Sequence, residues 1–490
     1  MRIFLIQTTF FFLIVSIQAQ QTAQQLIDQW ANDTYFKHAS VGVSVIDIES
    51  GQEIAGFNQE KSLIPASNLK VMTTATALAL LGADYRFETR LAYDGFIDTK
   101  GVLNGNIYII GGGDPSLGSP NMKEAETMDA VMRKFRLAIQ QAGIRKITGR
   151  IIGDDRIFTS AATGSNWQWL DLGNYYGCGA FGLNVNENLY YLGLKQRSSL
   201  GATPPVTSTS PFIPGLKFKN EIASAVKGSG DNAYIYSAPY SYQCHLRGTI
   251  PVGSGVFKIK GSIPNPPYFI AWKLADVLKK EVGILSMKPA ASLRDLPQND
   301  WPKSALSTIY TYKSPPLSAI IKRTNMKSVN LFAEALLRAI GLKYDQKGDT
   351  ETGLEAIKTY WTSRGVDFEG VQLYDGSGMA PRNVIPPYVL AQLLREMYKD
   401  KQLHTDFINS LPLAGHSGSL RNRLKNTRAE GRLRAKSGSL EQVRAYSGYV
   451  PTRSGKWLSF SILINNYQGK SGTVNKKLMA LMQGLAELVD

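Results

Sequence analysis

The chain has 490 residues, of which 43% are hydrophobic, and its 55 lysines and arginines outnumber 39 aspartates and glutamates to give a net charge of +16. This apolar content excludes a disordered chain, and at ~100–200 residues a domain the length predicts two or three domains. Cys178 and Cys244 are the only cysteines, so the sequence allows one disulfide and equally allows two free thiols.

The N-terminus predicts export. Arg2 precedes an apolar run from Ile3 to Ile17, and Gln18 and Ala19 lead into a glutamine-rich stretch. Residues 1–19 are therefore typical of a signal peptide cut after Ala19, because the run is shorter than the ~20 apolar residues that span a bilayer. We expect an exported protein of the periplasm or cell-wall space, and an N-terminal membrane anchor is the alternative.

A hairpin and a helix follow. Residues 41–48 and 53–57 alternate in the manner of strands, and residues 66–81 are good helix formers that end at Gly82, where a C-terminal cap belongs. Ser67 and Lys70 fall in the first turn of this helix, three residues apart, and so share one face. A neutral lysine amine at this distance can take the serine's proton and create a nucleophile for acyl transfer.

Residues 89–305 differ in character, because Gly, Pro, Ser and Tyr accompany short strand-like runs such as 106–110, 149–153 and 256–260. They predict a β-rich insertion of one or two subdomains that splits one domain into residues 20–88 and 306–490. Within it, Gly111 to Gly113 lack the spacing and the following helix of a dinucleotide-binding motif. A second Ser-x-x-Lys, from Ser224 to Lys227, shows that this pair alone is weak evidence.

The last third predicts the other half of the split domain. Helical patterns are expected at 329–340, 351–363, 387–399 and 474–489, and strands at 432–435, 443–450 and 457–465. With the N-terminal hairpin, these elements predict an α+β fold in which an antiparallel sheet is flanked by helices.

A serine-lysine acyl transferase also needs a second hydroxyl with an amide, and a basic strand. Ser328 and Asn330 stand at the start of a predicted helix, which places side chains better than the loop that holds the alternative Ser119-Pro120-Asn121. Lys436-Ser437-Gly438-Ser439 follows a strand-like run and can lie along a sheet edge, whereas the alternative Lys470-Ser471-Gly472-Thr473 falls in a turn.

A basic cluster lies close to the last of these motifs. In an exported protein it meets wall polymers and lipid head groups, so no nucleic-acid partner is expected. Peripheral membrane association stays open beside the simpler reading of a solvated basic face. The cluster consists of Arg421, Arg423, Lys425, Arg428, Arg432, Arg434 and Lys436.

Together these motifs resemble the class C penicillin-binding proteins, the D-alanyl-D-alanine carboxypeptidase/endopeptidase family. The long stretch between Lys70 and Ser328 is also typical of that family, and Ser437 departs from it because threonine is commoner there. The resemblance rests, in this order, on Pro65 to Thr76, Leu81 to Phe87, Gly112 to Leu117, Ser328 to Asn330, Tyr374 to Gly378 and Lys436 to Ser439.

The resemblance implies a penicillin-binding-protein/serine β-lactamase-like transpeptidase domain that removes D-alanine from peptidoglycan peptides and is inhibited by β-lactams. Ser67 would be the nucleophile, and Lys70 its base, with a pKa lowered from ~10.4 to about 7.5–8.5 by burial, by Lys436 and by the helix dipole. Ser328 would pass the proton to the departing amine. The substrate would be held by Asn330, Lys436, Ser437, Gly438 and Ser439, with the N–H groups of Ser67 and Ser439 as oxyanion hole.

Two other functions stay open, a serine β-lactamase or esterase and a non-catalytic wall-binding homologue. No E-x-x-L-N element is present to activate a deacylating water, and the full set of site side chains disfavours the wall-binding protein. Asp375-Gly376-Ser377-Gly378 is expected to be a structural turn. The four histidines show no metal spacing, so neither a metal nor a cofactor is expected. Endopeptidase activity, peptide preference and oligomeric state are left open.

Overall fold

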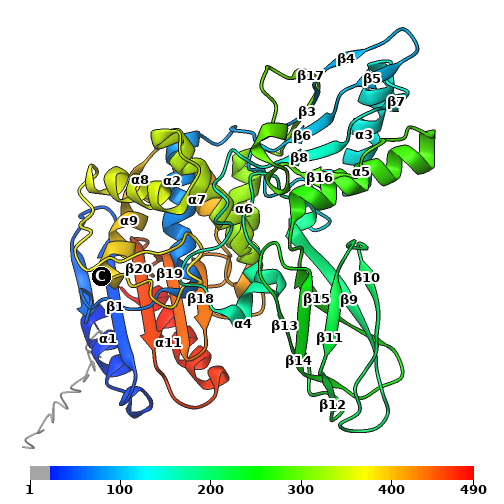
Figure 1. Ribbon diagram of the computed structural model, residues 1–490. Coiled ribbons are helices and arrows are strands. Elements are labelled where there is room, and N and C mark those ends of the chain that lie inside the picture. Colours follow the sequence, from blue (N-terminus) through cyan, green and yellow to red (C-terminus); the bar gives the residue numbers. More distant parts are fainter. Residues whose placement is uncertain (1–21, 490) are drawn as a thin grey trace, which may run out of the picture.

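The computed structural model describes residues 22–489. The predicted signal peptide, residues 1–19, lies outside the described residues. A main domain made from both ends of the chain carries a large insertion to one side, divided into two lobes (Figure 1). Within residues 22–489, no helix is long and apolar enough to cross a bilayer.

The main domain is built on a five-stranded antiparallel sheet in the order β18-β19-β20-β1-β2. The N-terminal hairpin thus pairs with the last strand, and Val43 lies opposite Ile462. This confirms the predicted sheet. Its strands are β1 (Ser40–Asp47), β2 (Glu53–Phe57), β18 (Arg434–Leu440), β19 (Val443–Pro451) and β20 (Trp457–Asn465).

Helices cover both faces of this sheet, because successive strand residues point to opposite sides. Ile462 packs with α1 (Ala23–Ala31) and α11 (Ser471–Glu487), whereas its neighbour Leu463 packs with the helical layer on the other face. That layer contains α2 (Leu69–Leu81), α6 (Leu317–Lys327), α7 (Asn330–Asp345), α8 (Thr350–Thr362), α9 (Pro387–Lys399) and α10 (His404–Ser410).

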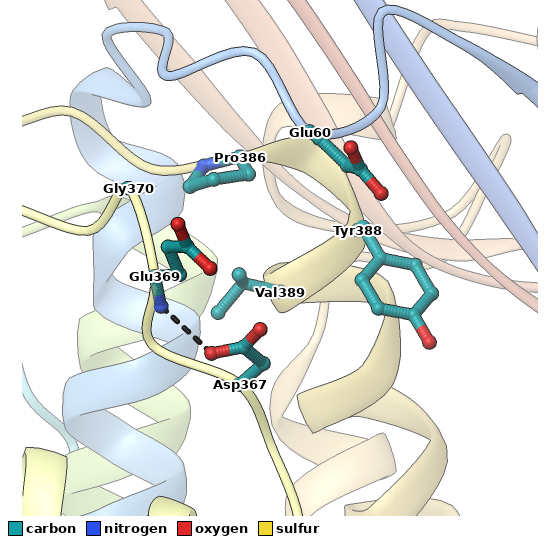
Figure 2. A pocket seen from close by; sticks show the side chains of 7 residues that line it. All are labelled: Glu60, Asp367, Glu369, Gly370, Pro386, Tyr388 and Val389. Atoms are coloured by element: carbon teal, nitrogen blue, oxygen red, sulfur yellow. Dashed lines mark hydrogen bonds between the residues drawn. The ribbon is translucent and has the colours of Figure 1, made fainter.

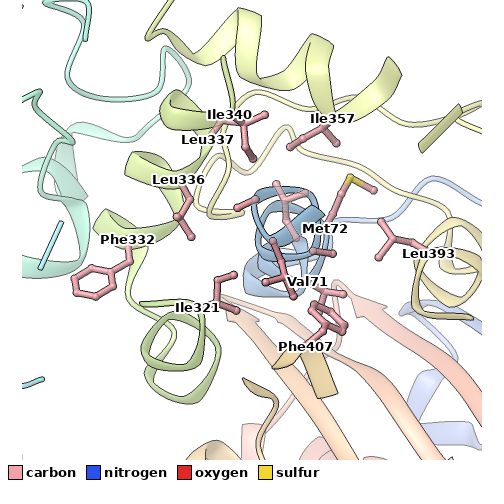
Figure 3. Close-up of a cluster of buried hydrophobic side chains, with 14 of the residues drawn as sticks. Val71, Met72, Ile321, Phe332, Leu336, Leu337, Ile340, Ile357, Leu393 and Phe407 are labelled. Atoms are coloured by element: carbon pink, nitrogen blue, oxygen red, sulfur yellow. The ribbon is translucent and has the colours of Figure 1, made fainter. Parts of the chain in front are cut away.

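Helix α2 is the centre of the helical layer, and every residue from Leu69 to Leu78 is buried. Val71 and Met72 project into a cluster of apolar side chains supplied by the surrounding helices (Figure 3). A short 3-10 helix, Ala66–Asn68, precedes α2, and Gly82 ends it with φ 87°. The predicted helix is confirmed, with its first turn tightened.

The first lobe of the insertion is a five-stranded sheet, β16-β8-β6-β3-β17, packed against two helices, beside a small sheet β4-β5-β7. The strands are β3 (Glu88–Tyr93), β4 (Phe96–Ile97), β5 (Val102–Asn104), β6 (Ile107–Ile110), β7 (Lys146–Ile147), β8 (Ile151–Asp154), β16 (Ala291–Ser292) and β17 (Ser307–Lys313). The helices are α3 (Met128–Gln141) and α5 (Pro266–Val282).

The second lobe is made of two small sheets, β10-β9-β15 and β11-β14-β12, with β13 paired to β14. Helix α4 (Trp169–Leu172) lies between this lobe and the main domain (Figure 1). The strands are β9 (Leu189–Lys195), β10 (Val206–Ser210), β11 (Lys217–Asn220), β12 (Ala223–Ala225), β13 (Asn232–Tyr236), β14 (Gln243–Pro251) and β15 (Val256–Ser262). Further short 3-10 helices are Thr34–Phe36, Tyr175–Gly177, Asn186–Asn188, Leu293–Asp295, Gln298–Asp300 and Gly418–Leu420.

Two observations add to the expected insertion. Besides its strands, the insertion contains the helices α3 and α5. Both helices begin at ordinary start signals in the sequence, Thr127 and Asn265, whose side chains cap the first turns. The boundary between residues 305 and 306 stays a prediction, and β17, which follows it, pairs with β3, with Lys313 opposite Glu88. We propose that the insertion runs from residue 88 to residue 313.

The two cysteines are unpaired. Cys178 and Cys244 are both buried, and no disulfide joins them. Burial raises the pKa of Cys178 to about 12, which keeps this thiol protonated and unreactive.

Candidate active site

Ser67 and Lys70 meet at the start of α2. Lys70 Nζ lies 2.8 Å from Ser67 Oγ, 2.7 Å from Asn330 Oδ1 and 2.6 Å from the carbonyl oxygen of Ser377. The amide of Asn330 has a fixed orientation, because its Nδ2 donates to the carbonyl of Tyr176 at 2.8 Å. Two of the three partners of Lys70 can therefore only accept hydrogen bonds.

This arrangement decides where a neutral Lys70 directs its lone pair. An uncharged amine has two N–H bonds, and the oxygens of Asn330 and Ser377 take both. The lone pair is then left facing the Ser67 hydroxyl, which can donate to it. The geometry is that of a hydroxyl nucleophile held against its base.

Burial sets the charge of Lys70. Its side chain is fully buried, and this burial lowers its pKa to about 7, although the charges of Asp375 and Glu334 act in the opposite direction. The pKa of Lys436 also falls well below its usual value, through burial and the charge of Lys70. The sequence predicted burial as a cause, but it did not predict the two opposing carboxylates.

Ser328 and Asn330 lie at the corner between α6 and α7. Ser328 ends α6 with φ 57°, the left-handed conformation, and its Oγ accepts a hydrogen bond from Lys436 Nζ at 2.9 Å. Asn330 is the first residue of α7. The corner thus joins Lys70 and Lys436 through Asn330 and Ser328. The alternative pair, Ser119 and Asn121, binds Glu187 in the insertion instead.

The motif from Lys436 to Ser439 lies within β18, the edge strand of the sheet, and not after a strand at 432–435 as predicted. Gly438 packs directly on the turn that holds Ser67, because a Cβ atom there would stand 2.5 Å from the carbonyl oxygen of Pro65. Only glycine allows this close approach. The alternative Lys470 to Thr473 begins α11.

The second Ser-x-x-Lys does not form a comparable pair. Ser224 lies in β12, where its Oγ donates to the carbonyl of Ala202 at 2.8 Å. Lys227 lies in a turn beyond the end of β12, so no helical turn brings it back to Ser224.

Two buried carboxylates behind Lys70 were missed by the sequence analysis. Glu334 stands one turn after Asn330 on α7 and accepts the N–H of Gly376 at 3.1 Å. Burial, together with the charge of Asp375, raises the pKa of Glu334. The i, i+4 spacing of Asn330 and Glu334 on one helix face was the available signal.

Asp375 organises the loop that reaches Lys70. Its carboxylate accepts hydrogen bonds from the N–H groups of Gly378 at 2.7 Å and Ala380 at 2.6 Å, and from the side chains of Asn383 and Trp167, both at 2.9 Å. These bonds fix the loop in which Ser377 offers its carbonyl to Lys70. The contacts match the structural role expected of this turn.

Two cavities differ in whether the predicted site residues line them. One, of about 430 Å³, is lined by Ser328 and Asn330 together with residues of the insertion. Another, of about 390 Å³, lies beside Pro386 and is lined by the acidic Glu60, Asp367 and Glu369 (Figure 2). None of the predicted site residues lines the second cavity. Among residues 22–489, no group of three His, Cys, Asp or Glu side chains is placed to hold a metal.

Comparison with known proteins agrees with the resemblance drawn from the motifs. The chain is 29% identical over 461 residues to a D-alanyl-D-alanine carboxypeptidase of Actinomadura sp. (strain R39), covering 90% of this chain and 81% of that protein. The crystal structure of penicillin binding protein 4 from Haemophilus influenzae matches with a TM-score of 0.78 at 25% identity, over 91% of this chain and 95% of the other.

The same Haemophilus protein, solved in complex with a β-lactam, matches with a TM-score of 0.73 at 23% identity, over 92% of this chain and 96% of that one. The predicted fold, a penicillin-binding-protein domain with a large insertion, is confirmed by these matches. The profile of the D-Ala-D-Ala carboxypeptidase 3 (S13) family covers residues 23–488, nearly everything the structure describes. The chain is thus an enzyme, a peptidase that belongs to the D-Ala-D-Ala carboxypeptidase 3 (S13) family.

Proposed function

We propose that Ser67 is the nucleophile of a serine-type D-alanyl-D-alanine carboxypeptidase acting on peptidoglycan stem peptides. The observation that carries this proposal is the contact of Lys70 Nζ with Ser67 Oγ at 2.8 Å, made while Asn330 Oδ1 and the Ser377 carbonyl accept its N–H bonds. A pKa of about 7 keeps a large fraction of Lys70 neutral near neutral pH, as a general base requires.

In the acylation step, Ser67 Oγ attacks the carbonyl carbon of the penultimate D-alanine while its proton passes to Lys70. The backbone N–H groups of Ser67 and Ser439 stabilise the oxyanion, a contribution of about 3–4 kcal/mol in comparable sites. The C–N bond then breaks while Ser328 relays the proton from Lys70 to the departing amine, so that Lys70 is neutral again, and water later hydrolyses the ester.

The remaining residues of the proposed site hold the substrate. Lys436, Ser437 and Ser439 bind the terminal carboxylate of the peptide along the edge of β18, with Gly438 as the spacer that lets the strand approach Ser67. Asn330 holds the substrate amide in addition to Lys70. The Lys436 to Ser328 hydrogen bond supports the relay of the proton, because it links the carboxylate site to the leaving amine.

We further propose that β-lactams acylate Ser67 and that the resulting ester is hydrolysed slowly. The relative from Haemophilus has been solved with a β-lactam, which supports this for a chain of the same fold. A serine β-lactamase or esterase is the second candidate function, and such an enzyme would hydrolyse its β-lactam ester quickly. A wall-binding protein without activity would not react with a β-lactam.

A labelling experiment tests the nucleophile. The wild-type protein should bind a fluorescent penicillin covalently and release D-alanine from a peptide that ends in D-Ala-D-Ala. Ser67→Ala should abolish both, whereas Ser224→Ala, the matched change in the other Ser-x-x-Lys, should leave both unchanged. Full labelling of Ser67→Ala would refute the assignment, and rapid turnover of the label would favour the lactamase.

Export to the periplasm or cell-wall space is also proposed, on the N-terminal pattern of the sequence. The basic cluster supports a contact with an anionic surface, since Arg421, Arg423, Lys425, Arg428 and Arg432 are exposed, whereas Lys436 is buried in the site. Salt-sensitive flotation with vesicles containing anionic lipid would support membrane association, and no binding at low salt would remove it.

A further inference from the structure

Asn68 directly follows the proposed nucleophile, and its side chain does not have the usual role of its residue type. Asparagine is favoured at the residue before a helix, where its side chain accepts an N–H of the first turn. Asn68 stands at that position before α2, but its side chain makes no such bond. The side chain is fully buried, so its polar atoms need partners elsewhere.

The side-chain amide of Asn68 binds the main sheet instead. Asn68 Nδ2 donates to Ser447 Oγ at 2.7 Å, and Ser447 Oγ donates to Ser461 Oγ at 2.9 Å. Ser447 lies on β19 and Ser461 lies opposite it on β20, and both are fully buried. A hydrogen bond is stronger in such a dry place than at the surface, because water does not compete for it. A polar tie therefore joins the turn of Ser67 to the sheet.

This tie depends on one hydrogen bond. Within residues 22–489 no group donates to Asn68 Oδ1, so the bond to Ser447 is the polar contact that orients the amide. Removal of either the amide or the Ser447 hydroxyl breaks the same bond. The two residues can therefore be tested separately and together.

Both N–H groups of the proposed oxyanion hole depend on β19. Ser439 lies on β18, the edge strand, which pairs with β19 and places Lys436 opposite Ser447. Ser67 lies on the turn that Asn68 ties to the same strand. Strand β19 is thus a common support for the two N–H groups, and Asn68 connects the turn to it.

We propose that Asn68 is a positioning residue, which holds the N–H of Ser67 at the right distance from the N–H of Ser439. The inference rests on the proposed function, in which these two groups stabilise the oxyanion formed from the D-alanine carbonyl. Asn68 acts through the turn and not on the substrate. Without the tie, the turn can move relative to β18, and the oxyanion loses stabilisation.

The test separates the oxyanion hole from the base. Asn68→Ala should lower the second-order rate of penicillin acylation roughly 10- to 100-fold, since a misplacement of about 1 Å can cost 10²-fold. A peptide boronic acid should lose affinity by a similar factor, because its adduct with a serine places a boron-bound oxygen in the oxyanion hole. The acidic limb of the acylation profile should stay in place, since Lys70 keeps its partners.

A double variant tests the hydrogen bond itself. Ser447→Ala should slow acylation by a factor similar to that of Asn68→Ala. The protein that carries both changes should be no slower than either single variant, because the same bond is lost in each.

Asn325 offers a matched control. It is also a buried asparagine, and its Nδ2 donates to two hydroxyls, Thr74 Oγ1 at 3.1 Å and Ser410 Oγ at 2.9 Å, within the helical layer. Asn325→Ala should lower the melting temperature at least as much as Asn68→Ala, because two bonds are lost. It should leave the acylation rate and the boronic acid affinity unchanged.

The outcomes separate this inference from the proposed function. An acylation rate in Asn68→Ala equal to the wild-type rate, an equal loss in Asn325→Ala, or additive losses in the double variant would overturn the positioning role. Should Asn68→Ala fail to fold, Ser447→Ala decides alone, since it removes only a hydroxyl. A wild-type protein that neither takes penicillin nor releases D-alanine would instead overturn the proposed function.

Discussion

At the scale of single residues, the chemistry of Lys70 depends on what its neighbours can accept. Asn330 Oδ1 and the carbonyl of Ser377 have no proton to give, so they can accept hydrogen bonds from the neutral amine as well as from the ammonium. Burial then favours the amine. The acylation rate should therefore follow the neutral fraction of Lys70.

The first prediction concerns pH. Because Lys70 has a pKa of about 7 and acts only when neutral, the second-order rate of penicillin acylation should rise with pH through about 7 and fall roughly tenfold for each pH step below 6. Stopped-flow or gel-based labelling between pH 5 and 9 measures this profile. A rate that is flat from pH 5 to 8 would contradict the role of Lys70 as base.

The second prediction concerns Glu334. Its charge raises the pKa of Lys70, so Glu334→Gln should lower that pKa and move the acidic limb of the acylation profile to lower pH. The other charged groups around Lys70 are Asp375, Lys436 and, further along α7, Arg338, and these stay in place. A merely structural role would reduce the rate at every pH without moving the limb. An acidic limb displaced to higher pH would contradict the expected sign.

At the scale of elements, β18 and the 3-10 turn before α2 depend on one glycine. Gly438→Ala should push β18 away from Pro65 and, since a misplacement of about 1 Å can cost 10²-fold, lower the acylation rate about 100-fold. Gly472→Ala at the start of α11 is the matched control, because no atom lies within 4 Å of the added methyl group. Equal labelling rates for the two variants would show that β18 adapts freely.

Helix α2 supports the site through its packed surroundings. Met72→Ala should remove buried contacts at the centre of the helical layer and cost about 2–5 kcal/mol of unfolding free energy. Leu200→Ala, at a side chain that is 65% exposed, should cost less than about 0.5 kcal/mol. Urea unfolding followed by tryptophan fluorescence measures both. A Met72→Ala variant as stable as the Leu200→Ala variant would contradict this packing.

Elements with strong local signals could be predicted from the sequence. Helix α9 and strand β20 were predicted with their observed bounds, because Pro387 starts the helix and the strand is a continuous apolar run. Helix α6 was missed. Its sequence contains many polar residues, so the apolar pattern is weak, and contacts with the rest of the domain stabilise the helix. The site motifs were recognisable, but their mutual contacts were not, because Ser377 and Tyr176 act through backbone carbonyls that carry no residue signature.

At the scale of the whole molecule, the insertion is a structural partner of the site. Tyr176 in the insertion fixes the Asn330 amide, and Glu187 in the insertion holds Arg323 on α6, five residues before Ser328. The lobes are therefore coupled to the α6–α7 corner. A substitution that breaks the ion pair between Arg323 and Glu187 should therefore affect both the insertion and the α6–α7 corner.

The last prediction tests that coupling. Arg323→Gln leaves the buried Glu187 without its cationic partner and should cost about 3–5 kcal/mol of stability. Arg364→Gln, which breaks a more exposed ion pair with Asp400, should cost at most about 1 kcal/mol. Thermal unfolding monitored by circular dichroism compares the two, and protease cleavage of the lobe should accelerate only in Arg323→Gln. Indistinguishable melting curves would show that the ion pair does not hold the insertion.

The pairing of β1 with β20 also sets the order in which the protein can mature. Val43 meets Ile462 across almost the whole length of the chain, and Ser67 meets β18 only after residue 440 has been made. The insertion lies between these partners and can fold as a unit while they wait. Every chain that stops before β20 therefore lacks the central strand pairing, so we expect hydrolytic activity only after nearly the whole chain has been made.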